Sequence, residues 1–139
     1  MKLIYTSLIV ILFACNSAKK SAQAQSKDLE SGIYEIVELK SDQYKANETY
    51  TINLNAEENR ISGKFDCNNF SCDFTKEGNN IEFGYAMATK MYCEDQMYNE
   101  EAFFGKLRSL KTYQFDGETL SFSNEEGEMI LKLKKTNNE

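Results

Sequence analysis

The fold is decided around residues 61–70, which read Ile61-Ser62-Gly63-Lys64-Phe65-Asp66-Cys67-Asn68-Asn69-Phe70. In the first half, the apolar or small residues Ile61, Gly63 and Phe65 alternate with polar ones. This period of two is typical of a strand with one buried face. In the second half, Asp and Asn side chains can bond their own backbone, so residues 66–69 predict a corner. The stretch therefore indicates one strand of an antiparallel meander.

The same alternation recurs on both sides of this stretch. It predicts strands around Tyr50-Ile52-Leu54, Ile81-Phe83, Tyr113-Phe115, Leu120-Phe122 and Met129-Leu131-Leu133, with Ile130 out of phase. Asp116-Gly117 between two alternating runs is a strong hairpin signal. The first strand is expected from Ile33 to Leu39, and its apolar residues on both faces predict that it is covered on both sides.

One segment, residues 94–110, has helical rather than strand spacing. Its apolar residues form one stripe of a helix, comprising Met97, Phe103, Phe104, Leu107 and Leu110. Acidic residues are concentrated in its first half and basic residues at its end, and this order of charges complements the helix dipole. The chain contains no proline that would interrupt a strand meander. We therefore expect a mainly β fold (α+β) of seven to eight short antiparallel strands with one helix packed on the sheet.

The N-terminus has the pattern of an export signal. A single charge, Lys2, precedes the uncharged run of residues 3–14, which is too short to cross a bilayer. The run ends in Leu12-Phe13-Ala14-Cys15, which resembles the lipobox of bacterial lipoproteins, so Cys15 is the predicted lipidation site. An ordinary signal peptide with an incidental cysteine is the alternative.

The domain boundaries follow from composition. Residues 1–15 are predicted to be the signal peptide, residues 16–31 a small and polar flexible tether, and residues 32–135 the folded domain. The expected location is the cell envelope, with a lipid anchor in the outer membrane and the domain on its periplasmic or surface face. Asn16 after the cysteine favours the outer membrane.

A second conspicuous segment is Ala88-Thr89-Lys90-Met91-Tyr92-Cys93. Together with residues 61–70 it resembles the META domain, the family of the heat-shock lipoprotein HslJ. That family combines a strand ending Ser-Gly, a Gly-Cys-Asn-x-Phe corner and a Thr-basic-Met-x-Cys element before a helix. The matching positions here are Gly63, Asp66, Cys67, Asn68, Phe70, Thr89, Met91 and Cys93. Asp66 stands where the family has Gly, and Cys72 where Gly is common.

The resemblance implies a curved antiparallel sheet or cracked barrel with one helix, and a disulfide between Cys67 and Cys93. A bridge across such a loop would stabilise an exported domain by about 3 kcal/mol on the loop-entropy model. Cys72 makes the number of cysteines in the domain odd. Bridges from Cys67 to Cys72 or from Cys72 to Cys93 therefore remain open.

Composition excludes several kinds of chemistry. The chain has no His, so no Ser-His or Cys-His pair can form, and it has neither CxxC spacing nor a phosphate-cradling glycine loop. We therefore expect no enzyme, cofactor or metal site. The net charge of −6, without a basic stripe, argues against nucleic acid as a partner. The domain is expected to be a monomer.

The expected function is that of a non-catalytic envelope lipoprotein, a stress-related interaction or assembly module that holds an envelope protein. The stress role is implied by the resemblance alone. The alternative is a carrier that binds an acyl chain or small apolar ligand in the half-barrel. An unpaired sheet edge or flat apolar patch would favour the module. An open apolar pocket of several hundred Å³ would favour the carrier.

Overall fold

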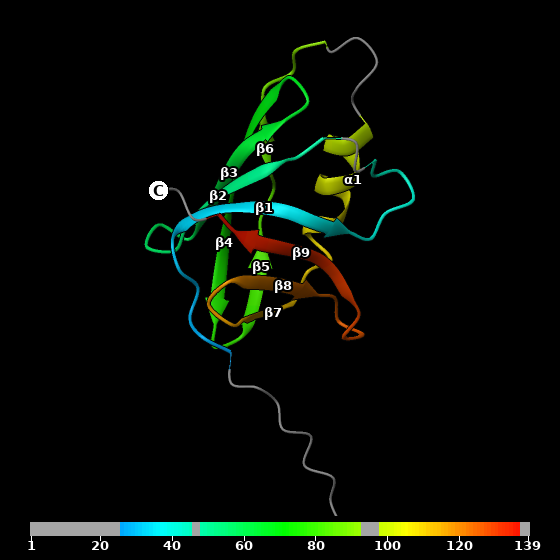
Figure 1. Ribbon diagram of the computed structural model, residues 1–139. Coiled ribbons are helices and arrows are strands. Elements are labelled where there is room, and N and C mark those ends of the chain that lie inside the picture. The colour runs from blue at the N-terminus through cyan, green and yellow to red at the C-terminus, as the bar shows by residue number, and fades with distance from the viewer. Residues whose placement is uncertain (1–25, 46–47, 93–97, 137–139) are drawn as a thin grey trace, which may run out of the picture.

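The computed structural model describes residues 26–45, 48–92 and 98–136 (Figure 1). These residues form nine strands and one helix: β1 (Gly32–Leu39), β2 (Thr51–Asn55), β3 (Arg60–Phe65), β4 (Asn68–Glu77), β5 (Asn80–Phe83), β6 (Met87–Ala88), α1 (Tyr98–Leu107), β7 (Thr112–Phe115), β8 (Thr119–Ser123) and β9 (Met129–Lys135). The predicted mainly β fold with a single helix is confirmed.

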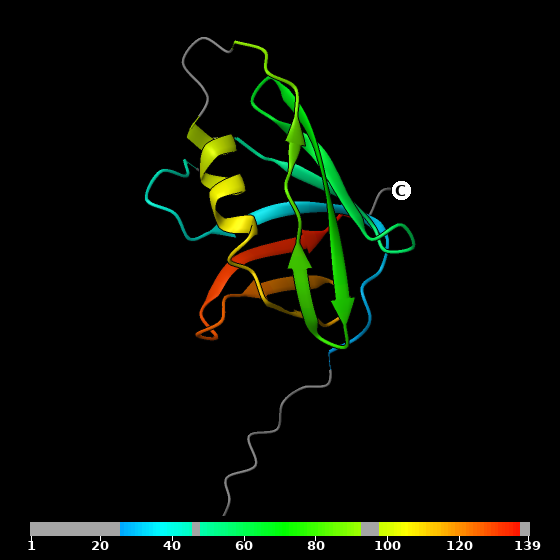
Figure 2. The same cartoon turned by 180° about the vertical axis from the view of Figure 1, so that it is seen from behind.

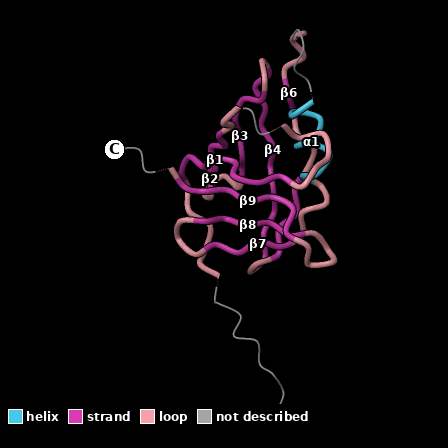
Figure 3. The backbone as a smooth tube through the Cα atoms, turned by 45° about the vertical axis from the view of Figure 1, so that its right-hand side comes forward, coloured by secondary structure: helices cyan, strands magenta, loops and turns pink. Residues whose placement is uncertain are grey.

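Eight of the strands close into an antiparallel barrel. Their order is β3-β2-β1-β9-β8-β7-β5-β4, and β4 pairs again with β3 to complete the ring. Figure 3 shows β1, β9, β8 and β7 side by side across the barrel, with β4 steeply inclined to them. The ninth strand, β6, lies outside the ring and pairs with β4 at Ser71↔Met87 and Phe70↔Ala88.

The ring is unevenly paired. β1 and β9, the first and last strands of the chain, share a long register that begins at Tyr34↔Lys135. Between β5 and β7 the register contains only Asn80↔Thr112. Two flanking backbone hydrogen bonds of 2.9 Å, from Ile81 N–H to Lys111 O and from Tyr113 N–H to Asn79 O, extend this contact.

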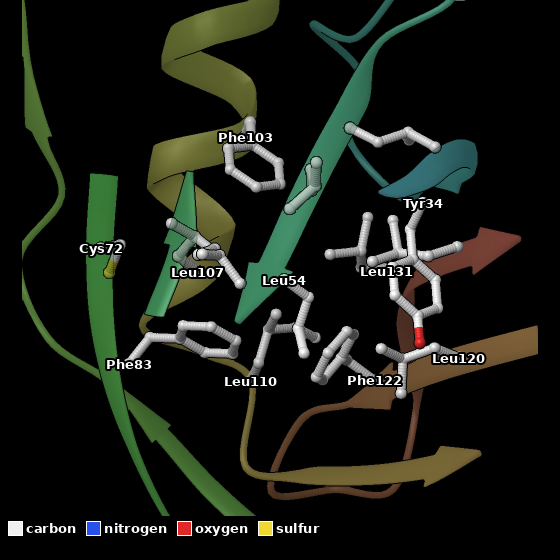
Figure 4. Packing of buried hydrophobic residues seen from close by; sticks show 14 of the residues in the cluster. Tyr34, Leu54, Cys72, Phe83, Phe103, Leu107, Leu110, Leu120, Phe122 and Leu131 are labelled. Carbon is white, nitrogen blue, oxygen red and sulfur yellow. The ribbon is translucent and has the colours of Figure 1, made fainter. Parts of the chain in front are cut away.

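Inward-facing side chains fill the barrel, and α1 covers part of it (Figure 4). The Phe103 ring stacks on Phe65 with a centroid distance of 4.6 Å, and Leu107 and Leu110 are buried next to it along the chain. The predicted helical stripe is thus confirmed for Phe103 and Leu107, while Phe104 is only partly buried. Leu110 is buried as expected but follows the end of the helix at Leu107. Met97 lies outside the described residues.

The first strand differs from its prediction. Tyr34, Ile36 and Leu39 are buried, whereas Ile33 and Val37 are 38% and 47% exposed, so the expectation of cover on both faces was wrong. A register shift between Ile36 and Glu38 is the physical reason. Leu39 is an odd number of residues from Ile36 and would face away from the core in a regular strand. The shift turns it back to the core. A second shift, where β8 pairs with β9, accounts for the out-of-phase Ile130, which is buried beside Leu131.

The domain also begins earlier than predicted. Lys27 N–H donates to Phe115 O at 2.8 Å, and Phe115 N–H donates to Ser26 Oγ at 3.0 Å. Leu29 is part of the core, and the Tyr34 hydroxyl donates to Glu30 O at 2.7 Å. Residues 26–31 are therefore part of the domain rather than of a flexible tether, because one buried leucine and these three hydrogen bonds hold them. The predicted signal peptide, Cys15 and the rest of the tether lie outside the described residues.

Candidate functional site

The motif residues that the structure describes, all but Cys93, gather around the corner between β3 and β4. Gly63 pairs with Phe70 across the two strands. A Cβ atom on Gly63 would lie 2.7 Å from Thr51 O and 2.9 Å from Phe70 Cε1. Both distances are shorter than any ordinary contact, so the backbone can approach the Phe70 ring only because residue 63 has no side chain.

Asp66 forms the corner itself and has a φ of 50°. Glycine adopts this left-handed region freely, and Asp tolerates it better than most residues. The conformation therefore accounts both for the usual Gly of the family and for the Asp that replaces it here. Asp66 Oδ1 accepts a hydrogen bond of 2.6 Å from the Tyr50 hydroxyl. Its other oxygen, Oδ2, is buried without a hydrogen-bond partner in the described part of the chain.

Asn68, which is 1% exposed, joins three segments of the chain. Its Oδ1 accepts from Met91 N–H at 2.8 Å and from the Thr89 hydroxyl at 3.0 Å, which holds the segment that follows β6. Its Nδ2 donates to Glu100 Oε2 on α1 at 2.9 Å. One amide thus fixes β4, the residues after β6 and the helix relative to one another.

A second amide, Asn99 on α1, continues the polar network. Its Nδ2 donates to the Tyr50 hydroxyl at 3.0 Å, and its Oδ1 accepts from Lys45 N–H at 2.7 Å. Burial raises the pKa of Tyr50, and the hydrogen bond to Asp66 adds to the shift. The motif residues Asp66, Asn68 and Thr89 are therefore engaged with the fold, which indicates a structural role.

The cysteines fall into two groups. Cys72 is free and buried, burial raises the pKa of its thiol, and its free state argues against both bridges that include it. Cys67 Sγ lies 3.7 Å from the carbonyl oxygen of Met91, two residues before Cys93. Cys93 lies outside the described residues, so the Cys67–Cys93 bridge stays a prediction.

β6 and the residues on either side of it, 85–92, present an exposed apolar surface beside this network. Tyr85, Met87, Met91 and Tyr92 are each more than half exposed, with Tyr92 at 87%. Ala86 and Ala88 alternate with Tyr85 and Met87 and pack against the core. β6 is the terminal strand of the sheet order, on the side of β4 that faces α1 (Figure 2). One edge of β6 is therefore unpaired by any strand among the described residues.

Three hollows follow one another along the outside of β4 and β5. The smallest, about 160 Å³, lies between residues 84–86 and α1. It adjoins one of about 420 Å³ that Asp73, Glu82, Arg108 and Lys111 help to line. The third, about 650 Å³, is lined largely by charged and polar side chains of β4 and β5. The Arg108 guanidinium lies 4.4 Å from the ring centroid of Tyr85, where the two smaller hollows meet.

Clusters of metal ligands and membrane-spanning helices are both absent from the described residues. They contain no group of three or more His, Cys, Asp or Glu side chains placed to hold a metal ion. They also contain no helix of the length and apolar character that crossing a bilayer requires.

The structure is an eight-stranded antiparallel barrel with one helix, and a polar network centred on an asparagine holds the barrel and the helix together. The chain belongs to the META domain family, whose model matches residues 27–137. No curated protein matches it by sequence.

Two solved structures share the fold. A protein from Burkholderia xenovorans superposes with a TM-score of 0.56 at 16% identity, over 79% of this chain and 85% of the other. A DUF4847 family protein from Bacteroides vulgatus superposes with a TM-score of 0.55 at 14% identity, over 78% and 95%.

The sequence did not reveal every residue of the site. Glu100 was expected only to complement the helix dipole, and Tyr50 only to face the core. Their partners, Asn68 and Asp66, lie far away in the chain, so no local pattern signals either contact. Tyr85 and Met87 were also missed, because β6 is only two residues long and has no periodicity to detect.

Proposed function

We propose that this chain is a non-catalytic interaction module of the bacterial cell envelope that holds a protein partner at the outer edge of β6. One observation carries the proposal: among the described residues, the outer edge of β6 has no strand partner, and it lies beside the exposed side chains of Tyr85 and Met87. An unpaired edge offers backbone N–H and C=O groups to an extended segment, and exposed apolar side chains add contact area.

The motif network supports this reading. Asn68 fixes both the chain after β6 and the helix opposite, so the strand is held in place before any partner arrives. A pre-organised edge loses less conformational entropy on binding than a mobile one. The most deeply buried polar residue of the motif would thus serve to position a surface.

We further propose that Cys15 is lipidated and that the domain is displayed from the outer membrane. The described chain starts at one end of the barrel, and the residues after β6 lie at the other (Figures 1 and 3). An N-terminal anchor would therefore leave the β6 edge directed away from the membrane, toward other envelope proteins. The Cys15→Ser variant should move from the membrane to the soluble fraction; unchanged fractionation would refute the anchor.

In-cell photo-crosslinking tests the interaction. A photoreactive amino acid at Met87, which is 68% exposed on β6, should give a discrete crosslinked product in living cells. The same amino acid at Val37, 47% exposed on β1, is the control and should give none. Identical products at both positions, or none at Met87, would contradict the proposal.

The carrier alternative has weaker support. The 420 Å³ hollow has the volume of a ligand site, but Asp73, Glu82, Arg108 and Lys111 contribute to its wall. Pockets for acyl chains are lined mainly by apolar side chains. A co-purifying lipid detected by native mass spectrometry would support the carrier hypothesis.

A further inference from the structure

The backbone of β6 shows which groups a partner can reach. Thr89 N–H donates to Asn69 O at 3.0 Å, and Ser71 pairs with Met87 two residues further along the antiparallel ladder. Hydrogen-bonded and non-hydrogen-bonded pairs alternate in such a ladder. Ala88, which pairs with Phe70 between these positions, therefore directs its N–H and C=O away from β4, toward the free edge.

An apolar hollow lies near this edge. Ala86, Phe104 and Leu107 contribute to the wall of the 160 Å³ hollow between the chain before β6 and α1. Its other lining residues are Gly84, Tyr85 and Arg108. The hollow can therefore accommodate one apolar side chain of an extended segment.

The third feature of the surface is the positive charge of Arg108. Of the acidic residues beside the adjoining 420 Å³ hollow, Asp73 binds Arg60 at 2.6 Å and Glu82 lies 3.8 Å from Lys111. No carboxylate lies within ion-pair distance of Arg108 in the part of the chain that the structure describes; its guanidinium faces the Tyr85 ring instead. A planar guanidinium held on an aromatic ring is well suited to bind a carboxylate.

We propose that the partner contributes an extended acidic segment, which adds to β6 as a further strand. Its backbone bonds to Ala88, an aliphatic side chain enters the hollow beside Leu107, and an Asp or Glu carboxylate binds Arg108. This inference rests on the proposed function and specifies the chemistry of the partner.

Peptide selection on the immobilised full chain tests it, with random heptapeptides displayed on phage as the probe. The selected peptides should combine an Asp or Glu with aliphatic residues. Synthetic versions should bind Arg108→Gln roughly tenfold more weakly than wild type, because a charge-assisted bond is lost. Lys106→Gln removes a positive charge from the last turn of α1, two residues before Arg108, and should change the affinity less than about twofold, because Lys106 lies outside the proposed site. Arg108→Lys should restore only part of the affinity.

A second variant separates this inference from the proposed function. Ala88→Pro removes the N–H at the free edge but keeps the ladder bonds of Met87 and Thr89, so it should abolish peptide binding. Circular dichroism establishes whether this variant folds; if it does not, the surface variant Tyr85→Ala replaces it, with a several-fold loss expected.

The possible results lead to different conclusions. Peptides without acidic residues, or equal losses with Arg108→Gln and Lys106→Gln, would overturn the acidic segment; the edge would survive if Ala88→Pro or its replacement still weakened binding. Failure to select any peptide would also overturn the inference, and the Met87 crosslink would then decide the proposed function independently.

Discussion

Single residues of the motif owe their identity to packing and to backbone conformation. Gly63 is glycine because a Cβ would meet Thr51 O and the Phe70 ring. Asp66 is acceptable at a corner with a φ of 50° and engages Tyr50, which a glycine could not do. The same motif therefore contains one position that excludes every side chain and another that accepts one with the right hydrogen-bond partner.

Gly63→Ala tests the close contact. The added methyl must displace a backbone carbonyl and a buried ring, so we expect the free energy of unfolding to fall by about 1–3 kcal/mol. Urea denaturation monitored by circular dichroism measures it. Gly105→Ala on α1 is the matched control, because its Cβ would meet no atom within 4 Å. There the helix propensity of Ala should raise the stability by up to about 1 kcal/mol. Similar changes at both glycines would contradict the packing argument.

At the scale of elements, alternation predicted most strands but could not predict bulges or short edges. Tyr50, Ile52 and Leu54 are buried as their spacing indicates. The period fails in β1, where the register shift after Ile36 reverses the two faces. No residue type in that strand marks the shift, which comes from pairing with β9. β6 exists because β4 and Asn68 hold it, which is information from elsewhere in the chain.

The N-terminal segment shows a second limit of local reasoning. A single leucine among polar residues has no periodicity, yet Leu29 is buried in the core. Leu29→Ala should therefore lower the free energy of unfolding by about 2–3 kcal/mol, the usual cost of truncating a buried leucine. Ile33→Ala, at a side chain that is 38% exposed, is the control and should cost less than about 1 kcal/mol. Denaturant titration of both variants measures the two losses in the free energy of unfolding. Equal losses would indicate that residues 26–31 belong to the flexible tether and not to the domain.

At the scale of the whole molecule, buried tyrosines couple stability to alkaline pH. Burial raises the pKa of Tyr34 to about 12, and it also raises the pKa values of Tyr44, Tyr50 and Tyr113. The unfolded chain loses these protons near pH 10, earlier than the folded one does. The stability that the neutral phenol of Tyr34 contributes is thus fully present below about pH 10 and is lost as pH rises toward 12.

We therefore expect the free energy of unfolding to fall steeply between about pH 10 and 12. Tyr34 alone would account for up to about 2–3 kcal/mol of that fall. Urea titrations at several pH values measure the slope. Tyr34→Phe should make the slope shallower, although it also removes the hydrogen bond to Glu30 O. Parallel pH profiles for the variant and the wild type would show that the phenol of Tyr34 is not responsible.

The pairing of the first strand with the last has a consequence for biosynthesis. β9 lies between β1 and β8, so both of these strands have one open edge until residues 129–135 have been made. The ring cannot close on a partly synthesised chain, however early the β2–β3–β4 hairpins form. Open edges in an incomplete chain invite pairing with other chains. Completion of the barrel thus waits for the synthesis of β9, and until then the chain depends on being kept apart from its neighbours.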